Sequence, residues 1–253
     1  MNDAAMIWNL FAGVLIGLAY LSAFAFVAGL TLRLFLYFKT PVPLKIVQTP
    51  GPKNAPGVLA RMAGDALIFP NLFQADKALW LGAWLFHACL LLIFVRHSRY
   101  FLYPVPELVI DWQAISIYAG FLFPIPALYL LWRRMASARV LFVSGLPDFG
   151  VLILLTAIAA TGMLVNYYAR AYLVDVKAFI LGLLTLTPVA PPQHPVFIAH
   201  FILVCLLLIY FPFSKLLHAG GIFFSPTRNQ IDNVLYPRYV NPWNEEVRID
   251  QNR

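Results

Sequence analysis

Charged residues are scarce in this chain of 253 residues. Asp, Glu, Lys and Arg together make up 11% of it, whereas hydrophobic residues make up 61%. Soluble domains contain roughly 25% charged and 45–50% apolar residues, because polar side chains must cover the surface that faces water. The composition therefore excludes an ordinary soluble domain and indicates a membrane protein.

The chain also lacks the cysteine motifs of metal and haem proteins. Its two cysteines, Cys89 and Cys205, lie far apart in apolar runs. They form neither a Cys-x-x-Cys metal motif nor the Cys-x-x-Cys-His motif that attaches haem covalently. These absences exclude a cysteine metal site of this kind and a covalently attached haem.

Uncharged stretches long enough to cross a bilayer recur along the chain, at residues 4–32, 78–95, 112–132, 149–169 and 178–214. The last of these stretches is divided by Pro188, Pro191, Pro192 and Pro195, so we expect a loop or surface segment there before the fifth span. Since about 20 apolar residues cross the hydrocarbon core, we predict an all-α integral membrane protein with spans at about 6–32, 78–101, 112–132, 149–169 and 195–218. The first stretch is too long for a signal peptide and no basic residue precedes it, so we do not expect it to be cleaved.

The basic residues predict the orientation of these five spans. Fourteen of the 18 Lys and Arg residues lie in the segments 33–77, 133–139 and 215–253, which the spans place on one side. The other side carries only Arg96, Arg99, Arg170 and Lys177, balanced by four acidic residues. The positive-inside rule therefore puts the amino terminus outside and the carboxyl terminus in the cytoplasm. The net charge of +7 lies wholly on the cytoplasmic side, so topology explains it and no nucleic acid partner is needed.

Two cytoplasmic segments complete the predicted organisation. The Pro- and Gly-rich loop at residues 39–76 contains a possible interfacial helix at 58–69, with Arg61 and Asp65 paired at i,i+4. A membrane domain of residues 1–218 is followed by an extended cytoplasmic tail, 219–253. We expect the tail to dock on a partner through its aromatic residues, which are Phe223, Phe224, Tyr236, Tyr239 and Trp243.

Four of the five histidines fall in two of the predicted spans. His87 and His97 lie in the second and His200 and His218 in the fifth, whereas His194 lies in a loop. A single membrane histidine can simply hydrogen-bond between helices, but four in two helices favour a functional site. Two imidazoles from opposite sides fill the axial positions of a haem iron. The pattern therefore predicts a haem-binding helical bundle.

The depths of these histidines suggest how they pair. His97 and His200 each lie about 8 Å from the outer end of their span, so they form a plausible outer pair. His87 and His218 remain for an inner pair, which fits less well, because the separations along the two helices are about 15 Å and about 27 Å. A kink at Pro212 and helix tilt would absorb part of this difference.

Basic residues lie close to the predicted ligands. Arg96 and Arg99 flank His97, and Lys215 precedes His218 by three residues. Such cations suit the anionic propionates of haem. Basic residues are also common at the ends of membrane helices for topological reasons.

The five-span topology and the histidine spacings of ten and eighteen residues resemble the gamma subunit of respiratory nitrate reductase, a dihaem cytochrome b family. The resemblance implies two haem b groups, with His97 and His200 ligating the outer iron and His87 and His218 the inner one. The tail strings KLLH (215–218), GIFFSPTRN (221–229) and VNPWN (240–244) are more narrowly similar to DsrM. DsrM-type subunits are the cytochromes b of the membrane complex associated with dissimilatory sulfite reductase, and related heterodisulfide-reductase-like quinol-oxidising complexes have similar subunits.

This resemblance implies electron transfer between the (mena)quinone pool and a cytoplasmic iron–sulfur, heterodisulfide-reductase-like subunit docked on the cytoplasmic loops and tail. It also implies other membrane and periplasmic subunits, a link to sulfur metabolism, and a bacterial or archaeal cytoplasmic (inner) membrane. Quinone would be an exchangeable substrate, with Glu107 and Asp111 as candidate proton acceptors in the outer loop. Two alternatives stay open. One is a transporter or proton-conducting protein that uses membrane histidines, and the other is a non-redox membrane anchor.

Overall fold

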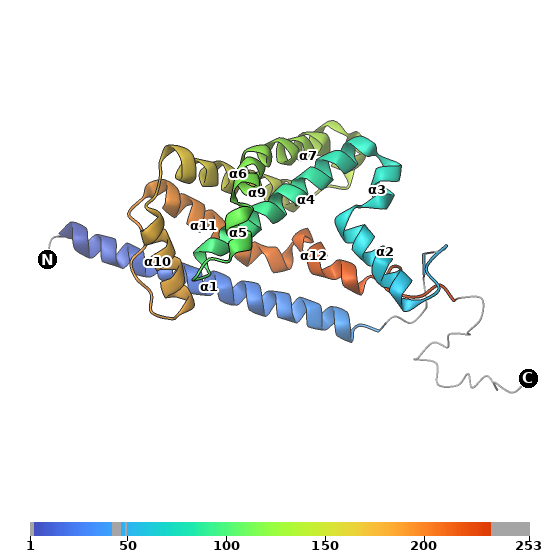
Figure 1. The fold of residues 1–253 in the computed structure, drawn as a ribbon, viewed down its shortest axis with the longest axis horizontal. Coiled ribbons are helices and arrows are strands. Elements are labelled where there is room, and N and C mark those ends of the chain that lie inside the picture. Colours follow the sequence, from blue (N-terminus) through green and yellow to red (C-terminus); the bar gives the residue numbers. More distant parts are fainter. Residues whose placement is uncertain (1–2, 42–46, 49, 234–253) are drawn as a thin grey trace, which may run out of the picture.

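The computed structural model describes residues 3–41, 47–48 and 50–233, and within them the regular structure is helical, without strands. Five helical segments are long and apolar enough to cross a membrane: Ala5–Lys39, Lys77–Tyr100, Gln113–Ala136, Leu146–Tyr168 and Pro195–Phe213. The predicted all-α membrane fold with five spans is thereby confirmed. The first residues of α1 lie at one end of the elongated bundle and the last described residues at the other (Figure 1).

The long helices are joined by short ones at both ends of the bundle. The α-helices are α1 (Asp3–Lys39), α2 (Ala55–Leu67), α3 (Pro70–Ala75), α4 (Lys77–His97), α5 (Glu107–Asp111), α6 (Gln113–Leu122), α7 (Pro124–Ala136), α8 (Ala138–Phe142), α9 (Leu146–Met163), α10 (Leu173–Leu184), α11 (Pro195–Tyr210) and α12 (His218–Gly221). The short turns are η1 (Ser98–Tyr100), η2 (Leu164–Tyr168, a π turn), η3 (Phe211–Phe213), η4 (Lys215–Leu217) and η5 (Ile222–Phe224). Helix α10 falls in a segment for which the sequence predicted a loop or surface segment.

Proline explains where two of the spans are interrupted. The third span changes from α6 to α7 at Phe123, directly before Pro124, which has no backbone N–H to donate. In the fifth span, α11 ends at Tyr210 and Pro212 lies in the 3-10 turn η3. The prediction of one helix from 195 to 218 is therefore wrong in its last third. His218 instead begins the separate short helix α12.

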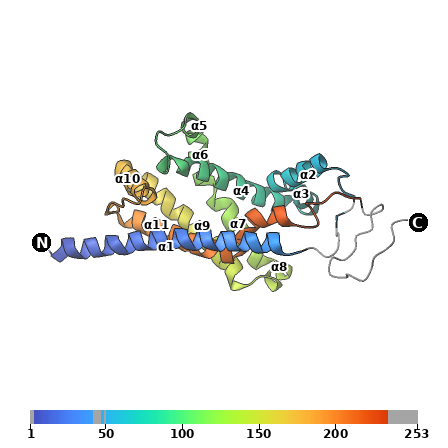
Figure 2. The same ribbon diagram turned by 90° about the horizontal axis from the view of Figure 1, so that it is seen from below.

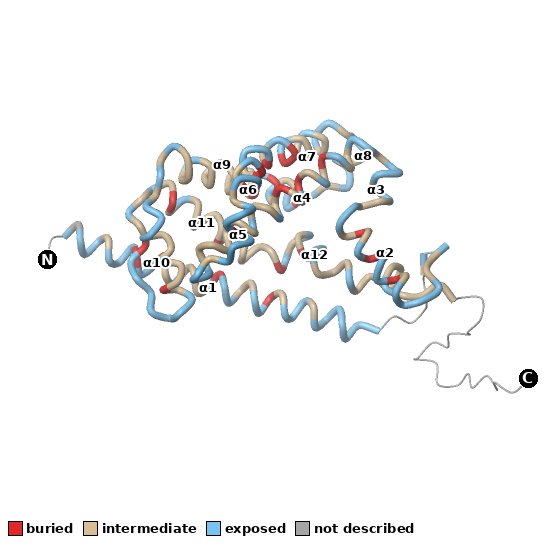
Figure 3. Tube along the Cα trace, in the orientation of Figure 1, coloured by how far each residue is buried: buried red, intermediate tan, exposed pale blue. Residues whose placement is uncertain are grey.

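The buried core lies between α4, α6, α7 and α9. It is formed by apolar side chains from all four helices, which are Phe86, Cys89, Ala119, Phe123, Ala127, Leu152 and Leu155. Gly82 lets α4 and α7 approach closely, because a Cβ atom at this position would lie 2.5 Å from the ring of Tyr129. Buried residues concentrate in this region (Figure 3).

Helix α1 lies along the side of the molecule away from this core (Figure 1) and runs beside α11 (Figure 2), and it also contacts α12. A Cβ atom at Gly29 would lie 2.7 Å from Pro212, so this glycine permits the contact between α1 and η3. The remaining faces of α1 carry exposed apolar side chains such as Leu10 and Phe24. Large apolar surfaces of this kind are expected to face lipid in a spanning helix.

The short helices α2 and α3 cover the end of the bundle at which α4 begins. Two indole N–H groups of α4 hold them there, because Trp80 donates to the carbonyl of Ile68 at 2.6 Å and Trp84 to that of Leu67 at 3.0 Å. The structure has a helix where the interfacial helix was predicted, but with different ion pairing. Asp65 pairs with Arg228 at 3.6 Å rather than with Arg61.

The beginning of the predicted tail packs against this same end of the molecule. The amide of Gln48 donates to the carbonyl of Thr227 at 3.1 Å, and the amide of Asp232 donates to the carbonyl of Pro52 at 2.7 Å. This part of the tail is therefore not a free arm. Residues 234–253, with Tyr236, Tyr239 and Trp243, lie outside the described residues.

Candidate functional site

The structure brings the rings of His97 and His200 close together across the bundle. His97 is the last residue of α4 and His200 lies in the second turn of α11. Their ring centres are 6.4 Å apart and their planes differ by 25°. The Nδ1 atom of His97 lies 2.7 Å from the carbonyl oxygen of Ile93. Since a carbonyl can only accept, Nδ1 carries the proton and Nε2 is left with a free lone pair.

For His200, the acceptor of the Nδ1 proton is a hydroxyl group. The Nδ1 atom of this histidine lies 3.0 Å from Oγ1 of Thr161 on α9, and this hydroxyl donates its single proton to the carbonyl of Ala157 at 2.8 Å. The hydroxyl therefore accepts from Nδ1–H of His200. The neighbouring Gly162 faces the same ring, where an added Cβ atom would lie 3.1 Å from Cε1.

His87 and His218 form a second facing pair at the end covered by α2. Their ring centres are 6.0 Å apart and their planes are nearly perpendicular, at 85°. Nδ1 of His87 donates to the carbonyl of Ala83 at 2.7 Å, and Nδ1 of His218 donates to the carbonyl of Lys215 at 2.7 Å. All four histidines thus share one arrangement, with Nδ1 engaged and Nε2 available as a ligand.

Both separations suit two imidazoles on opposite sides of one metal ion. A ligating nitrogen lies about 2 Å from a first-row metal and about 1 Å from its own ring centre, so the two ring centres should be about 6 Å apart. Among the described residues, no three His, Cys, Asp or Glu side chains gather in a group that could hold a metal ion. A haem fits such a donor set, because its porphyrin supplies four nitrogens and needs only two ligands from the protein.

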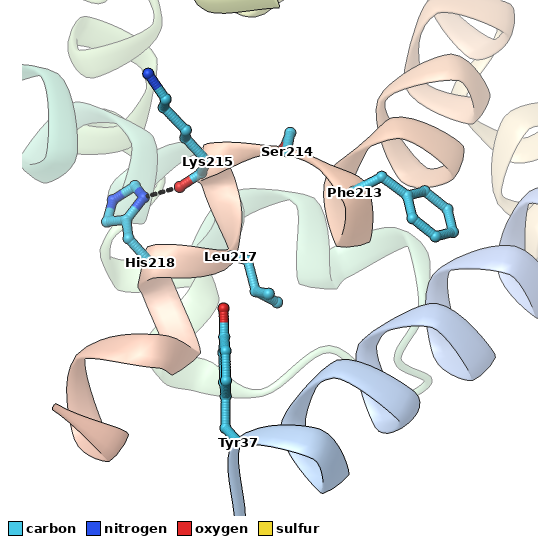
Figure 4. A pocket seen from close by; sticks show the side chains of 6 residues that line it. All are labelled: Tyr37, Phe213, Ser214, Lys215, Leu217 and His218. Atoms are coloured by element: carbon cyan, nitrogen blue, oxygen red, sulfur yellow. Dashed lines mark hydrogen bonds between the residues drawn. The ribbon is translucent and has the colours of Figure 1, made fainter. Parts of the chain in front are cut away.

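The second pair lies at the surface of the molecule, next to aromatic rings. Both His87 and His218 are exposed in the structure, and the rings of Phe69 and Phe86 lie 5.2 and 5.3 Å from that of His87. Beside His218 is an open surface pocket of about 650 Å³, which His87 does not line. It is lined by Tyr37, Phe213, Ser214, Lys215, Leu217 and His218 (Figure 4).

The three predicted cations make different contacts. Arg96 lies near the π turn η2, with guanidinium nitrogens 3.4 Å from Oδ1 of Asn166 and 3.5 Å from the Tyr167 hydroxyl. Arg99 lies 5.9 Å from the ring centre of Tyr100. Lys215 has a partner within the protein, because its ammonium group donates to Asp148 at 2.8 Å.

The predicted proton acceptors lie near the first pair's end of the bundle but apart from the histidines. Glu107 and Asp111 are both exposed on the short helix α5. The fifth histidine, His194, has a structural contact, because its Nδ1 atom accepts the amide N–H of Phe197 at the start of α11.

Sequence reasoning missed the residues that support the histidines. Thr161 and Gly162 stand next to each other in an apolar span, where a hydroxyl and a missing side chain are both signals of a close helix contact. Phe69 gave no such signal. It has a left-handed backbone, with φ of 55°, and directly precedes α3, where its ring lies against that of His87.

Comparison with known proteins identifies the class. Residues 71–234, which contain all four of these histidines, match the model of the family described as nitrate reductase gamma subunit. The chain therefore belongs to this family of membrane cytochrome b subunits, as the histidine spacing predicted.

Two archaeal relatives match nearly the whole chain. A protein of Archaeoglobus fulgidus is 36% identical, over 91% of this chain and 84% of its own length. A protein of Archaeoglobus profundus is 30% identical, over 92% of this chain and 83% of its own length. Both are described as the cytochrome b-like subunit of an Hdr-like menaquinol oxidoreductase. The predicted similarity to DsrM-type and heterodisulfide-reductase-like subunits agrees with these relatives.

Proposed function

We propose that this protein is a dihaem cytochrome b subunit that passes electrons between membrane quinol and a partner at its cytoplasmic face. The observation that carries the proposal is the pair of facing histidine couples, with ring centres 6.4 and 6.0 Å apart and every Nδ1 hydrogen-bonded. His97 and His200 would hold one haem b, and His87 and His218 the other. Each haem, when bound, supplies reversible one-electron chemistry.

The protein's own contribution is to orient the ligands and to supply an apolar interior. The acceptors for Nδ1 fix each imidazole in the tautomer that presents Nε2, and they also raise its basicity as a ligand. Three of these acceptors are backbone carbonyls within four residues of the histidine, so helix geometry sets them. The apolar core beside α4 and α9 keeps the surroundings of low polarity, which is one determinant of a haem's reduction potential.

The distribution of charge supports an orientation for this electron path. The end that carries His87, His218, α2 and the tail holds most of the basic residues, so we assign it to the cytoplasm. The His97–His200 haem would then lie near the outer surface, where Glu107 and Asp111 are candidates to accept protons from quinol. Arg96 and Arg99 remain candidates for its propionates, as Lys215 does for the inner haem.

The partners follow from the relatives. Because the two Archaeoglobus proteins are named as subunits of an Hdr-like menaquinol oxidoreductase, we propose menaquinol as electron donor and a heterodisulfide-reductase-like iron–sulfur subunit as acceptor. Docking would use the cytoplasmic loops and tail, in a complex with further membrane and periplasmic subunits. A role in sulfur metabolism and a place in a prokaryotic cytoplasmic membrane complete the proposal.

The test is a reduced-minus-oxidised visible spectrum of the purified protein, with haem counted per chain. We expect b-type bands and two haems in the wild type. His87→Ala should lose the inner haem and keep the outer one, because only one couple is broken. His194→Ala is the matched control, since this histidine caps α11 and belongs to neither couple. Absence of b-type bands would refute the proposal, and retention of both haems by His87→Ala would refute the ligand assignment.

A further inference from the structure

Only two charged side chains are buried within the described part of the chain, and both are carboxylates. Asp65 on α2 is 7% exposed and Asp148 at the start of α9 is 6% exposed. A buried carboxylate needs a partner wherever it lies. In this protein the nearest cation of each carboxylate, Lys215 for Asp148 and Arg228 for Asp65, comes from the one segment that carries His218. Arg134 of α7 lies farther from Asp148, at 3.8 Å.

This segment has little regular structure of its own. After α11 ends at Tyr210, it passes through the short pieces η3, η4, α12 and η5. The longest piece is the four-residue helix α12, which His218 begins. Such short turns are weak in isolation. The position of His218 must therefore come from contacts with the rest of the molecule.

The first of these contacts lies just before His218. The ammonium group of Lys215 is 2.8 Å from Oδ2 of Asp148, and the carbonyl of Lys215 accepts the Nδ1 proton of His218 (Figure 4). Asp148 is itself held, since its Oδ2 atom accepts the amide of Gly145 at 3.0 Å and lies 3.8 Å from Arg134. Lys215 thus links His218 to the beginning of α9 by one side chain and one carbonyl.

The second contact lies after His218 and leads to the opposite ligand. The guanidinium group of Arg228 is 3.6 Å from Oδ2 of Asp65, and the carbonyl of Arg228 accepts from Arg61 of the same helix. Helix α2 ends close to Phe69, whose ring lies 5.2 Å from that of His87. The helix that anchors the segment of His218 therefore also adjoins His87.

We propose that Lys215 and Arg228 are positioning residues, whose ion pairs with the two buried aspartates clamp the segment on both sides of His218 and hold this histidine opposite His87. The inference rests on the proposed function, because it concerns the placement of an inner haem ligand. It also gives Lys215 a role other than contact with a propionate.

The test uses the full-length protein in detergent or membranes, with Lys215→Gln, Arg228→Gln and the double variant. Arg139→Gln is the control, because Arg139 lies at the same end of the bundle and forms no ion pair with the residues that the structure describes. Haem is counted per chain, and the electron paramagnetic resonance signal and midpoint potential of each haem are measured. Each haem is assigned beforehand with the variant that removes one of its ligands.

Each single variant should shift the signal and potential of the inner haem and leave those of the outer haem unchanged. Arg228→Lys should stay close to wild type, since it keeps the charge. The double variant should fall from two haems per chain to one, because neither side of the segment is then held. The Arg139→Gln control should match the wild type in every measurement.

Three results would overturn the inference. A double variant with both haems and unshifted signals would show that the clamps do not place His218. Equal loss or shift of both haems would show that the pairs stabilise the bundle as a whole. If the double variant does not accumulate, the variant Arg228→Asp is compared with the charge-swapped variant that carries both Arg228→Asp and Asp65→Lys. A folded charge-swapped variant that does not recover the signal of the inner haem also overturns the inference. A wild type without b-type bands would instead refute the proposed function.

Discussion

Gly162 offers a sharp test of the outer site, because a single added methyl group would press on a proposed ligand. A Cβ atom built at Gly162 lies 3.1 Å from Cε1 and 3.6 Å from Nδ1 of the His200 ring. An ordinary carbon–carbon contact is about 3.5–4.0 Å. In Gly162→Ala the ring must therefore move by several tenths of an ångström, while its hydrogen bond to Thr161 on the same helix resists the movement.

The magnitude follows from the cost of overpacking. Inserting a methyl group into a packed site costs about 1–3 kcal/mol. If this cost destabilises only the haem-bound state, the outer haem should bind about 5- to 150-fold more weakly, because about 1.4 kcal/mol corresponds to a tenfold change in affinity. A larger side chain, as in Gly162→Leu, should abolish binding at this site. The inner haem should be unaffected, because its ligands do not contact Gly162.

The assay is haem content and the spectrum of each haem after purification and dilution, with Gly150→Ala as the matched control. Gly150 lies on the same helix, α9, and an added Cβ atom there meets no other atom within 4 Å. The control should keep both haems and gain slightly in stability, since alanine favours a helix by about 1 kcal/mol over glycine. Unchanged binding and spectra in Gly162→Leu would refute the assignment of His200 as a ligand held against α9.

Further predictions concern the hydrogen bonds around the site and at the start of α4. Thr161→Val removes the acceptor of His200 Nδ1 and should weaken the outer haem about 10-fold or more, whereas Thr161→Ser should retain it, as haem retention would show. The amide of Leu79, and then the guanidinium group of Arg133, hold the pKa of Asp76 below its ordinary value of 3.8. The charged carboxylate therefore stabilises the fold above pH 3.8, and this contribution is lost as the pH falls through the lower pKa of the folded state. Thermal unfolding in detergent should find Asp76→Asn less stable than wild type above pH 3.8 and the difference shrinking in stronger acid; a difference independent of pH would contradict this.

The number of spans and the candidate ligands could be predicted because each depends on a local property. A stretch such as 78–95 is long and apolar enough to cross a bilayer whatever surrounds it. Histidines in such a stretch are rare enough to single out His87 and His97 directly. The family resemblance implied that each haem is held by one histidine of the second span and one of the fifth. The depths of the histidines in the membrane supported the pair His97 and His200 but fitted the pair His87 and His218 less well.

The break in the fifth span explains why the depths of His87 and His218 fitted poorly. A single helix over residues 195–218 would rise by about 1.5 Å per residue and place His218 about 27 Å from His200. Because α11 ends at Tyr210 and the chain turns through η3 and η4, His218 is not at the depth that a continuous helix would give it. Pro212 signalled a kink, but no local rule fixes where the chain goes after one.

The sequence by itself thus determined a membrane-spanning helical protein, the family to which it belongs, and four histidines as its distinctive residues, since these follow from length, hydrophobicity and residue type. Only the tertiary structure decided how the paired rings are oriented and which residues support them. Thr161 lies 39 residues from His200, and Arg228 lies far along the chain from Asp65. Such partners are set by how helices rotate, cross and break, which are properties of the packed bundle and not of any one segment.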